Sequence, residues 1–166
     1  MEVTLGTGGT ISHPLSLDVI PFSGPALQGL TDVDGDGTEE IVAIDSCGAH
    51  FCGVAILFVR GRTLRPATIG REGGTLGVDA AALGATGFAC TEVEGRPGLT
   101  LTTAEAMPGL GQWSLLVTSG VWEDTTLVLG EVVETTFPLG ADGNLPREAY
   151  DRVPTIDCPG IESTYG

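Results

Sequence analysis

Short apolar runs separated by turn-forming residues constrain the fold of this chain more than any other feature. The runs are rich in β-branched side chains, and Gly, Pro, Asn or Asp lies between them; they cover residues 41–44, 54–59, 99–103, 113–118 and 126–133. This spacing is typical of short strands joined by tight turns. Several runs are apolar on both faces, which indicates central strands covered on both sides. The sequence therefore predicts an all-β fold.

Helical signals are sparse. Residues 146–152 predict a short C-terminal helix of about two turns, which Pro154 would stop. Residues 78–83 are a weaker helix candidate. The rest of the C-terminal part, residues 141–166, is expected to form a tail on a single β domain that spans residues 1–166.

An internal similarity divides the chain into two halves. The segment TDVDG at 31–35 recurs as TEVEG at 91–95, and residues 54–61 resemble residues 113–120. Both halves have the order strand, acidic turn, strand, loop, strand, turn, strand. Chance similarity between β-rich segments is the alternative, but the shared acidic turn favours a true repeat.

The acidic turn of the first half carries the strongest chemical signal. Its acids fall at alternate positions, Gly37 permits a sharp turn, and Thr38 offers a backbone carbonyl. Converging carboxylates repel one another by roughly a kcal/mol per pair, so they favour a bound cation. Oxygen ligands at this density suit Ca²⁺. The predicted ligands are Asp32, Asp34, Asp36, Thr38 and Glu40. A solvated acidic turn without an ion is the alternative.

The turn resembles the FG-GAP or VCBS family, the calcium-loop repeats of integrin-type β-propellers. An EF-hand would need an acid at loop position 12, where this chain has Ala43, and flanking helices. The family signature is D-x-D-x-D-G-x-x-D followed by an apolar strand. Residues 32–37 and the strand 41–44 match it, and Glu40 stands where the family usually has Asp. The match is specific over about residues 27–61 and weak over 87–130.

The resemblance implies two β-meanders, repeat 1 over about 26–70 and repeat 2 over about 86–133. Two repeats cannot close a propeller, which needs ~4–8 blades. We therefore expect them to pack as a small sandwich, a barrel-like sandwich or a propeller-like pair. The family also implies extracellular adhesion or ligand binding.

The second copy of the acidic turn departs from the metal-binding pattern. It has Glu92 and Glu94 at positions 1 and 3, but Arg96 at position 5. A guanidinium there would neutralise the two acids internally. We predict that this second turn binds no metal.

Four cysteines, an even number without a C-x-x-C motif, favour disulfides. The spacing of Cys47 and Cys52 suits a short disulfide across a hairpin loop, and Cys90 and Cys158 would then tie the tail to the body. Four cysteines allow three pairings, and four free thiols remain an alternative. Because His50 lies between Cys47 and Cys52, these three residues could be zinc ligands, but the sequence shows no clear fourth ligand.

Charge and composition exclude several functions. The chain has 22 acidic residues, seven arginines, no lysine and a net charge of −15. A basic surface for nucleic acid or an anionic membrane is therefore not expected, and Schiff-base or phosphate-loop lysine chemistry is excluded. The longest apolar run, 51–59, is too short to span a bilayer. No signal-peptide pattern follows Met1. The cysteines nevertheless favour a secreted or cell-surface protein that begins after a removed signal.

These observations favour a calcium-binding secreted or surface interaction module, in which the ion is structural. Its partner would be a glycan or a protein, and self-association into a homo-oligomer stays open. The alternative is a small secreted hydrolase acting on polysaccharide or peptide, although no catalytic residue can be assigned. Trp122 is a candidate ligand contact if its ring is exposed, and a core residue if it is buried.

Overall fold

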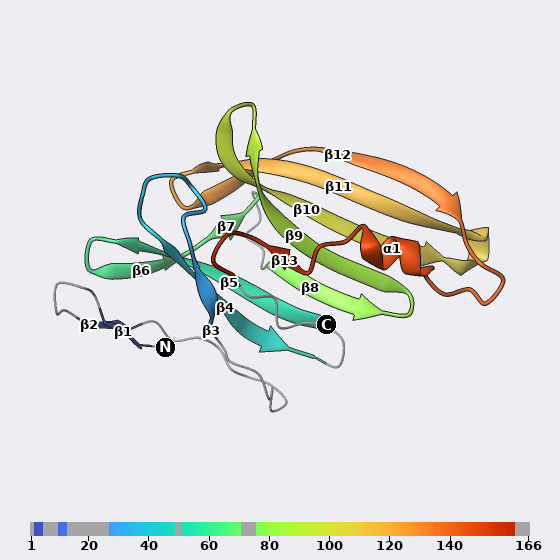
Figure 1. The fold of residues 1–166 in the computed structure, drawn as a ribbon, viewed down its shortest axis with the longest axis horizontal. Coiled ribbons are helices and arrows are strands. Elements are labelled where there is room, and N and C mark those ends of the chain that lie inside the picture. The colour runs from blue at the N-terminus through green and yellow to red at the C-terminus, as the bar shows by residue number, and fades with distance from the viewer. Residues whose placement is uncertain (1, 5–9, 13–26, 49–50, 71–75, 162–166) are drawn as a thin grey trace.

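The strands of the chain build one large sheet. The computed structural model describes residues 2–4, 10–12, 27–48, 51–70 and 76–161. Eleven strands join in the order β3-β4-β5-β8-β9-β10-β11-β12-β7, with β6 on β5 and β13 on β9 (Figure 1). A separate antiparallel pair is formed by β1 (Glu2–Thr4) and β2 (Thr10–Ser12). The all-β class with one short C-terminal helix is confirmed.

Two four-stranded antiparallel meanders make up most of the sheet. The first contains β3 (Leu27–Thr31), β4 (Glu40–Cys47), β5 (Phe51–Arg60) and β6 (Thr63–Pro66). The second contains β9 (Gly84–Val93), β10 (Arg96–Met107), β11 (Gln112–Glu123) and β12 (Thr126–Pro138). Both meanders place an acidic turn between their first two strands.

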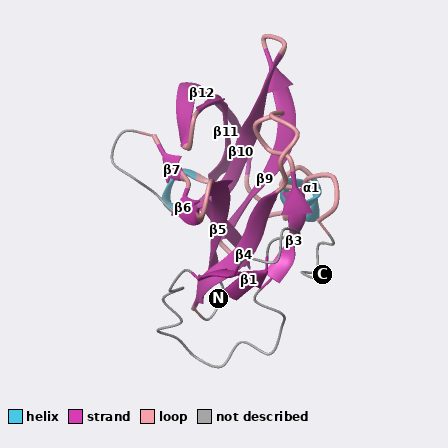
Figure 2. Ribbon diagram, turned by 90° about the vertical axis from the view of Figure 1, so that its left-hand side faces the viewer, coloured by secondary structure: helices cyan, strands magenta, loops and turns pink. Residues whose placement is uncertain are grey.

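Two short strands connect the meanders. β8 (Leu76–Ala81) pairs with the start of β5 on one side and with the start of β9 on the other. β7 (Thr68–Ile69) follows β6 after one residue and pairs in parallel with the start of β12. The path of paired strands therefore ends at β7, which is connected along the chain through Ala67 to β6, the partner of β5. Figure 2 shows β6 and β7 on one side of the molecule and α1 on the other.

The main core lies between the meanders. It takes buried side chains from β4, β5, β8, β9, β10, β11, β12 and β13, including Phe58, Phe88 and Leu99. On the opposite face of β4 and β5, Ile41, Leu57 and Leu64 form a smaller cluster. β4 is therefore buried on both faces, as its apolar run predicts. β12 is different, because Val133 is 61% exposed.

A short helix closes one end of the sheet. α1 (Arg147–Asp151) lies within the predicted helix at 146–152 but is one residue shorter at each end, and a 3₁₀ turn (Pro108–Leu110) joins β10 to β11. The Tyr150 hydroxyl donates to the Ala81 carbonyl at 2.7 Å, and Ala149 packs in a cluster with Trp113. The helix candidate at 78–83 is wrong. Leu76 and Val78 are buried at alternate positions between two neighbouring strands, so this segment forms β8.

Both disulfides form as the cysteine spacing suggests. Cys47 pairs with Cys52 across the β4–β5 hairpin, and Cys90 pairs with Cys158. The second bond fixes β13 (Ile156–Asp157) beside β9, to which β13 is parallel. Two disulfides suit an oxidising environment such as that outside the cell. Within the described residues, no helix is long and apolar enough to cross a bilayer.

Candidate metal centre

The acidic turn joins β3 to β4 and is folded by its own side chains. Gly35 and Gly37 have φ of 74° and 84°, values that L side chains rarely adopt. The backbone N–H of Gly37 donates to Asp32 Oδ2 at 3.0 Å. The N–H of Asp36 donates to Asp34 Oδ1 at 3.2 Å, and that of Thr38 donates to Asp36 Oδ1 at 2.8 Å. These local bonds turn the three aspartates toward the inside of the loop.

Glu40 lies at the base of the turn as the first residue of β4. Its side chain is 0% exposed, and Oε2 accepts the Val33 N–H at 3.0 Å. The second oxygen, Oε1, is buried without a hydrogen-bond partner. Burial, together with the negative charges of Asp34 and Asp36, raises the pKa of Glu40 from 4.5 to about 7, against the lowering effects of the Val33 hydrogen bond and of the Arg60 charge. A buried, unpartnered carboxylate oxygen is costly unless a cation binds it.

Three of the predicted ligands converge. Asp32, Asp34 and Glu40 each present a carboxylate oxygen, and these atoms lie within 4.8 Å of one another. Their burial ranges from exposed Asp32 to fully buried Glu40, so the group opens toward solvent on one side. An all-oxygen, anionic donor set with an orphaned buried oxygen fits a hard cation. This acidic triad could hold a metal ion.

The other two predicted ligands are placed differently. Asp36 directs Oδ2 toward the Arg60 guanidinium at 3.3 Å, and its side chain is 44% exposed. Thr38 contributes its N–H to the local bond with Asp36. Neither residue belongs to the acidic triad in this structure, so their roles as ligands stay predictions.

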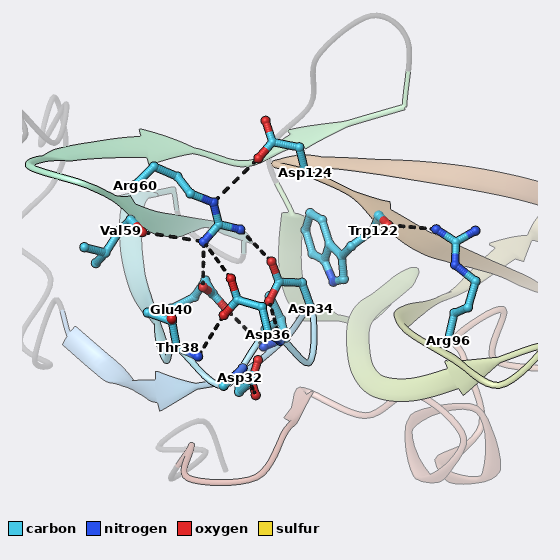
Figure 3. Close-up of polar contacts among 12 residues, drawn as sticks. Asp32, Asp34, Asp36, Thr38, Glu40, Val59, Arg60, Arg96, Trp122 and Asp124 are labelled. Carbon is cyan, nitrogen blue, oxygen red and sulfur yellow. Dashed lines mark hydrogen bonds and ion pairs between the residues drawn. The ribbon is translucent and has the colours of Figure 1, made fainter.

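Arg60 is the functional residue that the sequence analysis missed. It ends β5, and its guanidinium lies 2.6 Å from Asp34 Oδ2 and 3.8 Å from Glu40 Oε1 (Figure 3). Its Nε atom lies 3.5 Å from Asp124 Oδ1 in the β11–β12 turn, and its guanidinium carbon lies 4.8 Å from the centre of the Phe58 ring. The available signal was weak: one of seven arginines, directly after an apolar strand and before Gly61.

The second acidic turn has a different geometry. Glu94 and Gly95, both with positive φ, form a two-residue turn between β9 and β10. The expected neutralisation by Arg96 is wrong, because the Arg96 guanidinium donates instead to the Trp122 carbonyl at 3.2 Å (Figure 3). A two-residue turn is too short to fold the acids around a common point. That this turn binds no metal stays a prediction.

Trp122, a candidate ligand contact, and Cys47 and Cys52, candidate zinc ligands, have structural roles instead. Trp122 is only 6% exposed and packs edge-on against Phe58, with ring centroids 5.1 Å apart. This placement removes the interpretation in which an exposed Trp122 contacts a ligand. The Cys47–Cys52 disulfide likewise removes both sulfurs from a zinc site, and His50 lies outside the described residues.

Fold and site together define an all-β, disulfide-bonded protein with an acidic triad able to hold a metal ion. No family model matches the chain, and no curated protein matches it. A solved structure described as the crystal structure of CarG is similar over 83% of this chain and 96% of that chain, with 15% identity and a TM-score of 0.47. Similarity at this level carries no argument about this chain.

Proposed function

We propose that this protein is a calcium-binding secreted or cell-surface interaction module, and that the ion has a structural role. The single observation that carries the proposal is the buried Oε1 of Glu40, which lacks a hydrogen-bond partner and belongs to the acidic triad. Ca²⁺ accepts six to eight oxygen ligands at about 2.3–2.6 Å and tolerates irregular geometry. Asp32, Asp34 and Glu40 would hold it, and Asp36 and the Thr38 carbonyl are the proposed remaining protein ligands.

A structural role follows from the surroundings of the triad. The turn packs against the start of β10, because a Cβ on Gly35 would lie 2.5 Å from Pro97 Cγ. An ion that orders this turn would therefore also support its contact with the second meander. The proposed place outside the cell rests on the two disulfides, and extracellular Ca²⁺ is abundant enough to fill sites of modest affinity.

The binding partner is proposed only by class. A glycan or a protein ligand fits the resemblance to FG-GAP repeats, and self-association stays open. The hydrolase alternative has no site to support it among the described residues, and neither His13 nor His50 lies among them. A glycan array and a pulldown with the calcium-loaded protein would test the interaction role.

The metal site is tested by thermal melting of the protein in Ca²⁺ and in chelator. Because the ion binds the folded state, we expect the melting temperature to rise by several degrees in Ca²⁺. Asp34→Asn should abolish the rise, since it removes a triad charge while keeping the shape of the side chain. Glu39→Gln is the control, because exposed Glu39 lies outside the triad. Equal melting of the wild type in both solutions would remove the calcium proposal.

A further inference from the structure

Arg60, at the end of β5, places its positive charge beside the acidic triad, where it would repel a bound cation. Its guanidinium lies within 4 Å of Asp34, Asp36 and Glu40, and two of these belong to the acidic triad. Asp34, at 2.6 Å, has the closest contact. A fixed positive charge this near a divalent ion raises the free energy of the bound state. The same charge stabilises the turn when no ion is present.

Arg60 does not contact Glu40 as closely as a metal ion in the triad would. Nη1 of Arg60 is 3.8 Å from Oε1 of Glu40, beyond hydrogen-bond distance, and this oxygen has no other partner. A guanidinium is planar and donates in fixed directions, so it donates to Asp34 and leaves Oε1 of the deeper Glu40 carboxylate without a hydrogen bond. A spherical ion within the triad would contact both.

Arg60 also has an anionic partner on the second meander. Asp124, in the turn between β11 and β12, approaches Arg60 Nε at 3.5 Å. The Phe58 ring below the guanidinium provides a further favourable contact. Arg60 can therefore leave Asp34 and keep a negative partner without crossing the molecule. Asp124 has φ of 55°, which Asn also adopts readily, so its charge can be removed without disturbing the turn.

We propose that Arg60 is a built-in competitor for the metal site: it pairs with Asp34, Asp36 and Asp124 in the metal-free protein, and it gives up Asp34 and Asp36 and keeps Asp124 when Ca²⁺ binds the acidic triad. The proposal rests on the proposed calcium-binding function and adds a residue that sets the affinity of that site. It also makes the β11–β12 turn part of the metal response, because the partner that Arg60 keeps lies there.

The test compares Arg60→Gln with Arg62→Gln by calorimetric Ca²⁺ titration and by melting in chelator. Arg62 is exposed in the turn between β5 and β6, so Arg62→Gln removes the same charge at a position outside the site and serves as the control. We expect Arg60→Gln to bind Ca²⁺ at least about tenfold more tightly than the wild type and to melt at a lower temperature in chelator. Arg62→Gln should change both by little. Asp124→Asn should bind Ca²⁺ more weakly, because the displaced guanidinium loses its second partner.

The outcomes separate this inference from the proposed function. Ca²⁺ binding that is equal or weaker in Arg60→Gln than in the wild type overturns the competition. Binding by Arg60→Gln but not by the wild type supports the competition and refutes calcium binding as the native function. No Ca²⁺ binding by wild type, Arg60→Gln or Asp124→Asn overturns both. If Arg60→Gln fails to fold in chelator, the Ca²⁺ affinity of Asp124→Asn decides. An affinity equal to that of the wild type would contradict the role of Asp124 as the partner of Arg60 in the calcium-bound protein.

Discussion

Glu40 has an unfavourable electrostatic position for a carboxylate, because it is buried and lies near Asp34 and Asp36. A buried carboxylate with one free oxygen binds a proton more readily than water-exposed glutamate does, and its pKa is raised from 4.5 to about 7. A raised folded-state pKa stabilises the protein below pH 4.5, and this stabilisation is lost as the pH rises through 7. In the metal-free protein, Glu40 therefore weakens the fold at neutral and alkaline pH. A bound cation would remove this effect by stabilising the ionised form.

We predict that metal-free wild type loses about 1–3 kcal/mol of unfolding free energy between pH 5 and pH 8 relative to Glu40→Gln. Glutamine does not titrate, and its carbonyl can still accept the Val33 N–H. Urea unfolding of both proteins at several pH values, after removal of metal by dialysis, measures the difference. Saturating Ca²⁺ should abolish the loss in the wild type. Parallel pH profiles of the two metal-free proteins would contradict the burial of an ionisable group here.

The residue scale also shows how far the site could be predicted. Alternating acids with a glycine at position 6 located the turn, and local bonds to Asp32, Asp34 and Asp36 follow from that spacing. Arg60 lies 20 residues after Glu40 and reaches the turn only because β4 and β5 are antiparallel neighbours. Pairing of strands, which local patterns do not encode, decides such contacts. The error on Arg96 has the same cause.

At the scale of elements, the β3–β4 hairpin and the β9–β10 hairpin contact each other. The acidic turn presents Gly35 to Pro97, the second residue of β10 after the two-residue turn of the β9–β10 hairpin. Apolar periodicity predicted parts of β4, β5, β10, β11 and β12, because strands with one or two buried faces leave a clear pattern. It did not predict β8 (Leu76–Ala81), which overlaps the helix candidate at 78–83. Nor did it reveal that much of β12 is exposed, since Val132 and Val133 are apolar and yet face solvent.

We predict that Gly35→Ala destabilises the metal-free protein by about 1–2 kcal/mol more than Gly37→Ala does. Both glycines have positive φ, so both substitutions introduce backbone strain. Only at Gly35 would the new methyl also meet Pro97, since no atom lies within 4 Å of a Cβ on Gly37. Chemical unfolding in chelator measures the two losses. Adding Pro97→Ala to Gly35→Ala should recover most of the excess, and no recovery would contradict a direct contact between the turns.

At the scale of the whole molecule, several contacts between the two meanders lie beside the acidic triad. The acidic turn contacts Pro97, Arg60 links the end of β5 to Asp124, and Arg96 donates to the Trp122 carbonyl. The two meanders are thus joined here as well as through β8 and β7. Ordering of the acidic turn by an ion should therefore stabilise both meanders and not one loop alone.

We predict that Ca²⁺ raises the unfolding temperature of the far end of the sheet as much as that of the metal site. Trp122 lies near the triad, whereas Trp113 packs on Phe137 in a separate cluster. The two tryptophans are nine residues apart on β11, a distance of about 30 Å along a strand. In Trp122→Phe, which keeps an aromatic ring against Phe58, fluorescence reports on Trp113 alone. Its melting curve should coincide with the circular dichroism curve and shift with it in Ca²⁺. A Ca²⁺ shift seen by Trp122 in the matched variant Trp113→Phe, but not by Trp113, would show that the ion stabilises only its own loop.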